Sequence, residues 1–238
     1  MSFDNIRRIA SRDYDLWAQL GRGRAVLDTP EKLDQYLYSY GPMTKAQWRT
    51  LLSELSLIPE PIEIIDYGCG QGLATALLFD HFGDDFIKSV QKVVLIEPSE
   101  VALRRAGAII SCYSADQFQV ETINKTMDAI DAEDLLGKTG ILTNHIFSNV
   151  LDIDGYDHFK LLEKIFQRKG RHCILAVSHD RSFEGGSSRF KDLETAVCDP
   201  QYSEWFTVQQ TQIWQFECGN GKPAIAWVLE IEVIDGSF

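Results

Sequence analysis

A strand-length apolar stretch that runs directly into three closely spaced glycines constrains the fold of this chain more than any other feature. The stretch is Ile62–Tyr67, and Gly68, Gly70 and Gly72 follow it at every second position. Glycine tolerates positive φ angles and lets a ligand approach the backbone closely. Apolar residues at helical spacing continue over residues 72–82, and the N-terminus of such a helix offers unpaired N–H groups. The segment predicts a strand, a ligand-binding turn and a helix.

Short apolar segments alternate with amphipathic segments through the rest of the chain. We expect further strands at residues 93–96, 119–123, 140–146 and 172–177, and further helices at 99–110, 126–136 and 156–167, the last opened by Asp154 as N-cap. Alternation of this kind builds parallel β-α-β units. Residues 211–218 and 224–234 flank a turn at 219–222 and predict a terminal β-hairpin. The polar stretch 179–202, with its most flexible part at 184–188, is expected to be a lid or a surface loop.

The first sixty residues differ from the rest because their apolar residues recur at three- and four-residue intervals. This spacing predicts helices over residues 3–20 and again after a break at Gly41–Pro42. The pattern changes at Pro59–Pro61. We therefore divide the chain into a helical N-terminal extension, residues 1–60, and an α/β domain, residues 61–238.

The charge of the chain is acidic and unevenly distributed. The 238 residues include 23 Lys and Arg and 35 Asp and Glu, which gives a net charge of -12. Residues 1–60 carry eight basic and eight acidic side chains, so the whole acidic excess belongs to residues 61–238. A uniformly basic groove for nucleic acid is therefore not expected. Five arginines of the extension form either a local basic patch or a solvated helix face: Arg7, Arg8, Arg12, Arg22 and Arg24.

Neither membrane insertion nor secretion is expected. The longest uninterrupted apolar run is Ala224–Leu229, far shorter than the ~18 residues of a membrane-spanning helix, and the sequence does not start with a basic segment followed by an apolar one. The five cysteines are widely spaced and contain no C-x-x-C pair, so we expect reduced thiols and no metal site. The composition is typical of a cytoplasmic protein.

The residues around the glycines favour an adenosine ligand over a dinucleotide. A dinucleotide fingerprint has the form G-x-G-x-x-G, and Leu73 stands at its third glycine position. Asp66 would repel a pyrophosphate, but it can attract a ligand ammonium group directly or through water. Glu97 follows the next clear strand, where a carboxylate can accept hydrogen bonds from both ribose hydroxyls of an adenosine.

With this order of strand, acid, glycines, helix, strand and second acid, residues 60–180 resemble the class I S-adenosylmethionine-dependent methyltransferases. The resemblance implies an α/β fold with a Rossmann-like doubly wound sheet, a C-terminal antiparallel β-hairpin and a helical N-terminal extension. It also implies S-adenosylmethionine as cofactor. The positions that match the family's cofactor site, with their neighbours in the same two loops, are Asp66, Gly68, Cys69, Gly70, Gly72, Glu97 and Pro98.

Other cofactor contacts of the family have less specific counterparts here. The family's adenine contact follows the third strand, where this chain has Asn124 and Lys125, or Ser114–Asp116 in an alternative alignment. In many members, aromatic residues that precede the core cover the cofactor. In this chain Tyr36, Tyr38 and Tyr40 stand in this place, and Tyr40 is the candidate contact. The alternative is that these tyrosines only pack against the core.

The end of the fourth strand is where family members place groups that face the acceptor. Residues 143–152 contain no Asn/Asp-Pro-Pro-aromatic tetrad of the kind found in amino-methylating nucleic-acid enzymes. No cysteine of the chain follows a proline, as it does in cytosine-C5 enzymes. A protonated nucleophile needs a base, for which His145 is the first candidate and His179, after the fifth strand, the second. The alternative for both is a structural histidine.

The acidic α/β domain, without a nucleic-acid module, favours a methyltransferase that acts by in-line displacement on a small-molecule acceptor. One alternative is an enzyme that methylates RNA or protein and docks its substrate on the N-terminal arginines. Another is a non-catalytic cofactor-binding module. No feature of the sequence indicates an oligomeric state.

Overall fold

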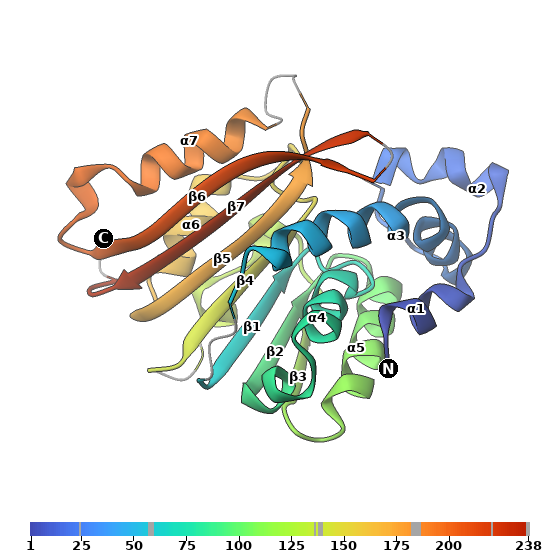
Figure 1. Ribbon diagram of the computed structural model, residues 1–238, viewed down its shortest axis with the longest axis horizontal. Coiled ribbons are helices and arrows are strands. Elements are labelled where there is room, and N and C mark those ends of the chain that lie inside the picture. The colour runs from blue at the N-terminus through green and yellow to red at the C-terminus, as the bar shows by residue number, and fades with distance from the viewer. Residues whose placement is uncertain are drawn as a thin grey trace.

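A single seven-stranded sheet forms the centre of the protein in the computed structural model (Figure 1). The structure describes residues 1–238 apart from 24, 57–59, 136, 138–139, 182–186, 220 and 237–238, and apart from the side chain of residue 22. Within the described residues the strand order is β3-β2-β1-β4-β5-β7-β6. The strands are β1 (Ile62–Tyr67), β2 (Val90–Ile96), β3 (Gln119–Ile123), β4 (Leu142–Ser148), β5 (Gly170–His179), β6 (Phe206–Cys218) and β7 (Lys222–Val233).

The first five strands are parallel, and the last two form an antiparallel hairpin. β1 lies between β2 and β4, so the direction of strand succession reverses at β1. β7 runs antiparallel to both β5 and β6. The predicted Rossmann-like α/β sheet with a C-terminal hairpin is confirmed, and β1 and β3 have the predicted bounds. Ligands of such sheets bind at the carboxyl ends of the strands where the order reverses.

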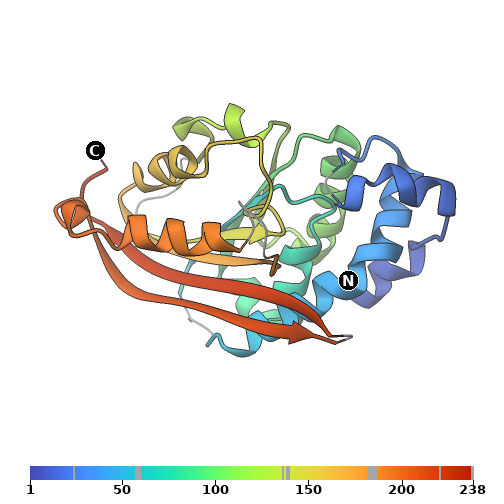
Figure 2. The same ribbon diagram turned by 90° about the horizontal axis from the view of Figure 1, so that it is seen from above.

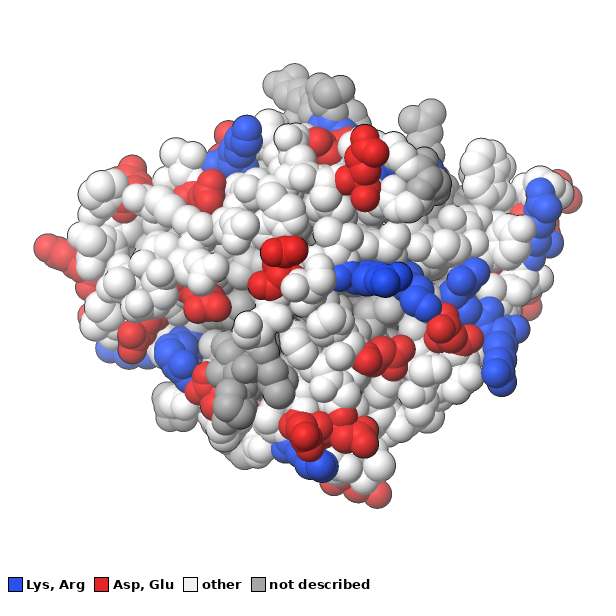
Figure 3. Space-filling view, in the orientation of Figure 1, with Lys and Arg blue, Asp and Glu red and all other residues white. Residues whose placement is uncertain are grey.

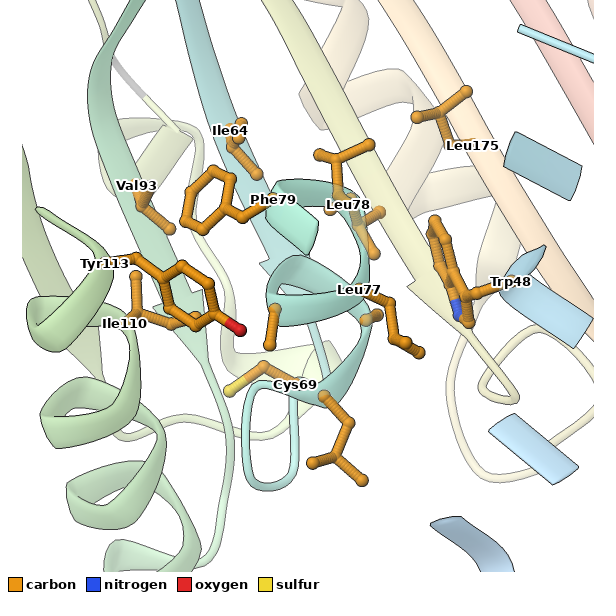
Figure 4. Close-up of a cluster of buried hydrophobic side chains, with 14 of the residues drawn as sticks. Trp48, Ile64, Cys69, Leu77, Leu78, Phe79, Val93, Ile110, Tyr113 and Leu175 are labelled. Atoms are coloured by element: carbon orange, nitrogen blue, oxygen red, sulfur yellow. The ribbon is translucent and has the colours of Figure 1, made fainter. Parts of the chain in front are cut away.

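Helices cover both faces of the sheet (Figures 1 and 2). One face carries α3 (Pro30–Ser53), α4 (Leu73–Ser89) and α5 (Glu100–Ser114), and the other carries α6 (His158–Phe166) and α7 (Ser188–Val197). In the core of the first face, Trp48 of α3 and Phe79 of α4 pack in one cluster with strand residues such as Ile64 (Figure 4). These side chains are at most 1% exposed, and burial of each stabilises the fold by ~1.5–3 kcal/mol.

The N-terminal helices lie at the end of the molecule opposite the C-terminus (Figures 1 and 2). Short elements precede α3: α1 (Phe3–Ile6), η1 (Arg7–Ile9), α2 (Tyr14–Gln19) and η2 (Gly21–Gly23). α3 continues through Pro42, so the expected break at Gly41–Pro42 is wrong. A proline inside a helix costs ~3 kcal/mol. Fully buried Leu37 and Trp48, one on each side of the proline, pack in the same core cluster as α4 and hold the two halves of the helix together.

Two other helix predictions also differ from the structure. Residues 126–136 form two short 3-10 turns, η3 (Met127–Ala129) and η4 (Ala132–Leu135), in place of an α-helix, and residue 136 lies outside the described residues. α6 begins after Asp157, whose carboxylate accepts hydrogen bonds from the backbone N–H groups of Phe159 and Lys160. Asp154 is therefore not its N-cap.

The polar stretch 179–202 contains a helix where only a loop or lid was expected. α7 buries Phe190, Leu193 and Val197 against the sheet, and the turn η5 (Pro200–Tyr202) follows it. Residues 184–186 of the predicted flexible part lie outside the described residues. None of the helices that the structure describes is long and apolar enough to span a bilayer.

Candidate functional site

The three glycines after β1 all adopt positive φ angles, but their surroundings differ. The φ angles are 61° at Gly68, 53° at Gly70 and 73° at Gly72. A Cβ on Gly68 would lie 2.8 Å from Cγ1 of Val150, and one on Gly72 would lie 3.3 Å from Cβ of Ala106. Apart from its chain neighbours, a Cβ on Gly70 would meet no atom of the described residues within 4 Å. Packing therefore requires glycine at the first and third positions, whereas the second faces open space.

That open space belongs to a cavity of about 350 Å³ at the carboxyl ends of β1, β2 and β4. Gly68 and Gly70 form part of its wall. The N-terminal extension contributes residues 23, 25–27 and 36, and the segments after β2, β3 and β4 complete the lining. The cavity therefore lies at the place where the strand order reverses, which is the usual ligand site of an open α/β sheet.

Glu97 connects the glycine turn to the end of β2. Its Oε2 accepts a hydrogen bond of 3.0 Å from Gly70 N, and its Oε1 accepts one of 2.9 Å from Ser99 N. Burial raises the pKa of the Glu97 carboxyl, and these two N–H donors partly offset that rise. Glu97 and Pro98 both line the cavity.

The Asn124 side chain holds the loop after β2 by hydrogen bonds and does not line the cavity. Its Nδ2 donates to the backbone oxygens of Glu97 and Pro98, at 2.9 Å each. Lys125 follows it directly and does line the cavity. Of the first of the two adenine alignments, Lys125 therefore lines the cavity and Asn124 does not.

Asp66 is fully buried at the end of β1. Its Oδ2 accepts a hydrogen bond of 2.7 Å from Thr75 Oγ1, and its Oδ1 has no hydrogen-bond donor among the described residues. Burial raises the pKa of Asp66 to about 7, and the nearby Glu97 carboxylate adds to the rise. Asp66 itself does not line the cavity, but Gly68, two residues further along the chain, does.

Cys69 turns its side chain away from the cavity. It is 7% exposed and belongs to the core cluster that Figure 4 shows. Its backbone N–H donates to the Ile96 carbonyl at 3.0 Å and its own carbonyl accepts from Gly72 N at 2.8 Å. The backbone of Cys69 therefore shapes the turn, while its thiol is a core group whose pKa burial raises well above its usual value.

The tyrosines of α3 occupy different environments. Tyr36 lines the cavity, and the Tyr40 ring packs against it with a centroid distance of 4.9 Å. Tyr38 is 42% exposed. Since residues four apart share a helix face and residues two apart do not, the helix directs Tyr36 and Tyr40 together and Tyr38 outward. Tyr36, rather than the expected Tyr40, borders the larger cavity.

Hydrogen bonds hold the extension against the glycine turn. Gln71, inside the turn, donates from Nε2 to the Leu33 carbonyl at 3.0 Å. Arg105 of α5 donates to Asp34 at 2.6 Å and to Gln71 Oε1 at 3.0 Å. Ser99 also donates to the Leu27 carbonyl. These contacts fix the segment that forms one wall of the cavity.

A second cavity of about 20 Å³ adjoins the first. Both are lined by Tyr36 and Asn149, and the smaller one adds Tyr40, Asp152, His179 and Arg181 among its polar groups. Burial and the positive charge of Arg181 lower the pKa of His179, so its imidazole is neutral at pH 7 and can accept a proton. His179 lines the smaller cavity and not the larger one.

His145 lies inside β4 and lines neither cavity. It is 1% exposed, with its Nδ1 3.0 Å from Tyr67 Oη and its Nε2 2.9 Å from His172 Nδ1. His172 Nε2 contacts the Arg168 carbonyl at 2.8 Å. Because a carbonyl oxygen can only accept, all three hydrogen bonds of this series have the same direction. His172 donates to the carbonyl, His145 donates to His172, and Tyr67 donates to His145. The structure thus gives His145 a core role and no access to an acceptor, contrary to its expected use as a base.

We expect this buried series of hydrogen-bonded side chains to make the protein less stable in acid. Burial lowers the pKa of His145 well below 6.5 and that of His172 to about 4. Below pH 6.5 the unfolded chain therefore binds protons that the folded protein excludes. The free energy of unfolding consequently decreases as the pH is lowered. His145→Gln, which can keep both hydrogen bonds, should remove about 1.4 kcal/mol of this loss per pH unit. Urea unfolding at several pH values measures the difference, and the same exchange at exposed His81 is the control. Parallel profiles for wild type and His145→Gln would contradict the expectation.

Sequence reasoning missed the residues that end β4. Asn149 adopts a φ of 57° and lines both cavities. Its amide pairs with that of fully buried Gln47 through two hydrogen bonds of 2.8 and 3.1 Å. Trp48 Nε1 donates to Ser148 Oγ at 2.9 Å. An asparagine after a strand is a signal for positive φ, but its partners on α3 are about 100 residues away in the chain.

None of the described arginines of the extension lines either cavity. Arg8 and Arg12 are exposed, and Arg7 is partly buried. Arg24 and the side chain of Arg22 lie outside the described part of the chain.

Several solved structures share this fold. The plantazolicin methyltransferase BpumL in complex with S-adenosylhomocysteine matches with a TM-score of 0.53 at 14% identity, over 96% of this chain and 97% of that chain. An S-adenosylmethionine-dependent methyltransferase from Aquifex aeolicus matches with a TM-score of 0.50 at 14% identity, over 92% and 99%. The mitomycin 7-O-methyltransferase MmcR matches with a TM-score of 0.50 at 16% identity, over 92% of this chain and 60% of that chain.

The sequence itself matches no protein-family profile and no curated protein. At identities this low, the solved structures establish the fold alone. The resemblance to the fold of the class I methyltransferases is confirmed.

Proposed function

We propose that this chain is an S-adenosylmethionine-dependent methyltransferase that binds its cofactor in the larger cavity. The observation that carries the proposal is the 3.0 Å hydrogen bond between Gly70 N and Glu97 Oε2. It joins the glycine turn after β1 and the acid after β2 at one cavity. The shared fold of the solved methyltransferases supports the same reading.

The residues around the cavity fit this cofactor. Glu97 suits the two ribose hydroxyls, and the open space at Gly70 admits a ligand close to the backbone. The buried Oδ1 of Asp66, which has no donor among the described residues, suits the ammonium group of the methionine portion, directly or through water. Pro98 and Met127 offer apolar surface for the adenine. When bound, the cofactor supplies an electrophilic methyl group on a sulfonium sulfur.

Residues 1–60 act in this proposal as a cap on the domain formed by residues 61–238. Tyr36 and residues 25–27 form one wall of the cavity, and Gln71 and Arg105 anchor this wall. A cap of this kind excludes water from the reacting groups and aligns them, which is the main task in an in-line methyl transfer.

The acceptor is a compact molecule whose nucleophile enters the smaller cavity. Support comes from the size of that cavity, about 20 Å³, and from the tyrosine wall around it. The net charge of -12 also disfavours a polyanionic substrate. His179 takes the place of His145 as the proposed base, since it borders this cavity and is neutral at pH 7.

His179→Ala should lower turnover by ~10²-fold, the usual contribution of a general base, and leave the affinity for S-adenosylhomocysteine unchanged. His81→Ala on the exposed side of α4 is the matched control. Turnover and calorimetric titration on both variants separate the base from a structural residue. Equal losses of affinity and turnover in His179→Ala would assign it a structural role.

Cofactor binding should release a proton from Asp66. With a pKa of about 7, this carboxyl is half protonated at neutral pH, and a cationic ligand nearby favours its ionised form. The affinity for S-adenosylhomocysteine should rise about tenfold from pH 6 to pH 8. Asp66→Asn should remove this dependence, while Asp85→Asn on exposed α4 should retain it. A pH-independent affinity in the wild type would argue against a role for Asp66.

The proposal as a whole is tested with methyl-labelled S-adenosylmethionine and a fractionated cell extract. Label in a small molecule supports it. Label in RNA or protein would replace the acceptor class while keeping the reaction. Tight binding of S-adenosylhomocysteine with no labelled product in any fraction would identify a non-catalytic module.

A further inference from the structure

Three exposed aromatic side chains lie on the N-terminal helices α2 and α3, and two of them lie beside one arginine. Tyr14, Trp17 and Tyr38 are 69%, 58% and 42% exposed. The guanidinium carbon of Arg12 lies 4.3 Å from the centre of the Tyr14 ring and 5.9 Å from that of Tyr38. Tyr14 and Trp17 are three residues apart on α2 and share one side of that helix. We call Arg12, Tyr14, Trp17 and Tyr38 the aromatic patch.

This part of the surface is unusually apolar for the molecule. Eight large apolar side chains are exposed among the described residues, and six of them lie within the first 38 residues. One exposed aromatic ring needs no explanation, but here two rings lie beside one guanidinium and a third shares a side of α2 with one of them. Tyrosine, tryptophan and arginine are also the residue types that dominate the centres of protein interfaces.

The distribution of charge indicates what covers the patch. All of the net charge of -12 belongs to residues 61–238, whereas residues 1–60 are neutral in sum. On the face that Figure 3 shows, the densest group of Lys and Arg side chains lies over the N-terminal helices. Two copies of this acidic chain therefore repel each other least where their extensions meet. A neutral extension also gives a nucleic acid little of the cationic surface that it needs.

We propose that the aromatic patch is the contact between two copies of this chain in a symmetric dimer. A two-fold contact must be complementary to itself. The patch meets this condition because the positive charge of Arg12 is followed by the exposed carboxylates of Asp13 and Asp15, so that each copy offers both signs to the other. The aromatic rings supply the apolar centre.

The size of the patch is adequate for the centre of such a contact. An aromatic side chain buries ~150–250 Å² when it is fully covered, so the three rings leave roughly 250–400 Å² to a partner at their present exposures. One side of a standard interface buries ~800 Å². The rings therefore account for up to about half of one side, and the surrounding polar residues of α2 and α3 form the rim.

The proposal is independent of the cofactor and is tested by sedimentation velocity of the full chain at ~5–100 μM. The wild type should reach twice the 27.0 kDa of one chain. The double variant Tyr14→Glu/Trp17→Glu should remain at the mass of one chain. Phe159→Glu, at an exposed aromatic residue of α6, is the matched control and should dimerise like the wild type. Circular dichroism and thermal unfolding establish that each variant is folded.

A wild type with the mass of one chain at ~100 μM would overturn the proposal, and so would a folded double variant that still dimerises. Loss of the dimer in Phe159→Glu alone would move the contact to α6. An RNA oligonucleotide that binds a monomeric wild type and fails to bind the double variant would assign the patch to nucleic acid.

Discussion

Replacing Glu97 with alanine is expected to weaken binding of S-adenosylhomocysteine by ~10²–10⁴-fold while the protein stays folded. The range follows from the loss of two hydrogen bonds to a charged acceptor, each worth ~1.5–3 kcal/mol in a buried site. Within the protein, Glu97 also accepts from Gly70 N and Ser99 N, so its removal loosens the glycine turn as well. Both effects reduce affinity. Calorimetric titration of the variant measures the change.

Two companion variants separate these effects. Glu100→Ala removes an exposed carboxylate only three residues away, which pairs with Arg104 on the surface of α5, and it should bind like the wild type. Glu97→Gln can still accept from Gly70 N but lacks the charge, so its affinity should lie between those of wild type and Glu97→Ala. The wild type should also bind S-adenosylhomocysteine more tightly than NAD or NADP, because a pyrophosphate would meet the Asp66 carboxyl. Stabilisation by a dinucleotide alone in a thermal-shift panel would favour an oxidoreductase.

The glycine turn was predictable from the sequence because its requirements are local. Three positive φ angles between a strand and a helix call for glycine at fixed spacing, and the acid at the end of β1 is part of the same short segment. Glu97 was predictable for a related reason, since a buried strand of apolar residues ends directly before it. These positions depend little on the rest of the fold.

His145 shows where such reasoning fails. The apolar pattern predicts that the fourth strand ends at residue 146, but β4 runs to Ser148. This extension by two residues leaves His145 inside the sheet, between Tyr67 and His172, and puts Ser148 and Asn149 at the cavity. Strand ends depend on pairing with neighbouring strands, which a single sequence does not display.

The tyrosines of α3 show the same dependence on distant contacts. Gly41–Pro42 predicts an interruption, and an interrupted segment gives no reason to distinguish Tyr36 from Tyr40. Packing of α3 against α4 keeps the helix continuous, so its 3.6-residue period decides which ring borders the cavity. In α7, by contrast, the signal was present in the sequence, since Phe190, Leu193 and Val197 have helical spacing, but the polar residues between them conceal it.

Gly70→Val is the variant with the largest expected effect, a loss of S-adenosylhomocysteine affinity of at least ~10³-fold. Apart from its chain neighbours, no described residue comes within 4 Å of a Cβ on Gly70, and this space opens into the cavity, so a branched side chain would occupy the volume of the ligand. The exchange also has a backbone cost, since a β-branched residue at a φ of 53° is strained by ~1–2 kcal/mol or more. A loss of binding by itself would therefore not distinguish a blocked cavity from a weakened fold.

Gly140 resolves this ambiguity because it also has a positive φ angle but lies away from the cavity. Its φ is 80°, and among the described residues a Cβ there would meet no atom within 4 Å apart from its chain neighbours. It lies just before the start of β4, whereas the cavity lies at the other end of that strand. Gly140→Val should therefore lower the melting temperature about as much as Gly70→Val and still bind S-adenosylhomocysteine like the wild type. If both variants bind equally well, the glycine turn does not hold the ligand. If both lose binding equally, strain rather than occupancy of the cavity is responsible, and only a selective loss in Gly70→Val supports a cofactor at this turn.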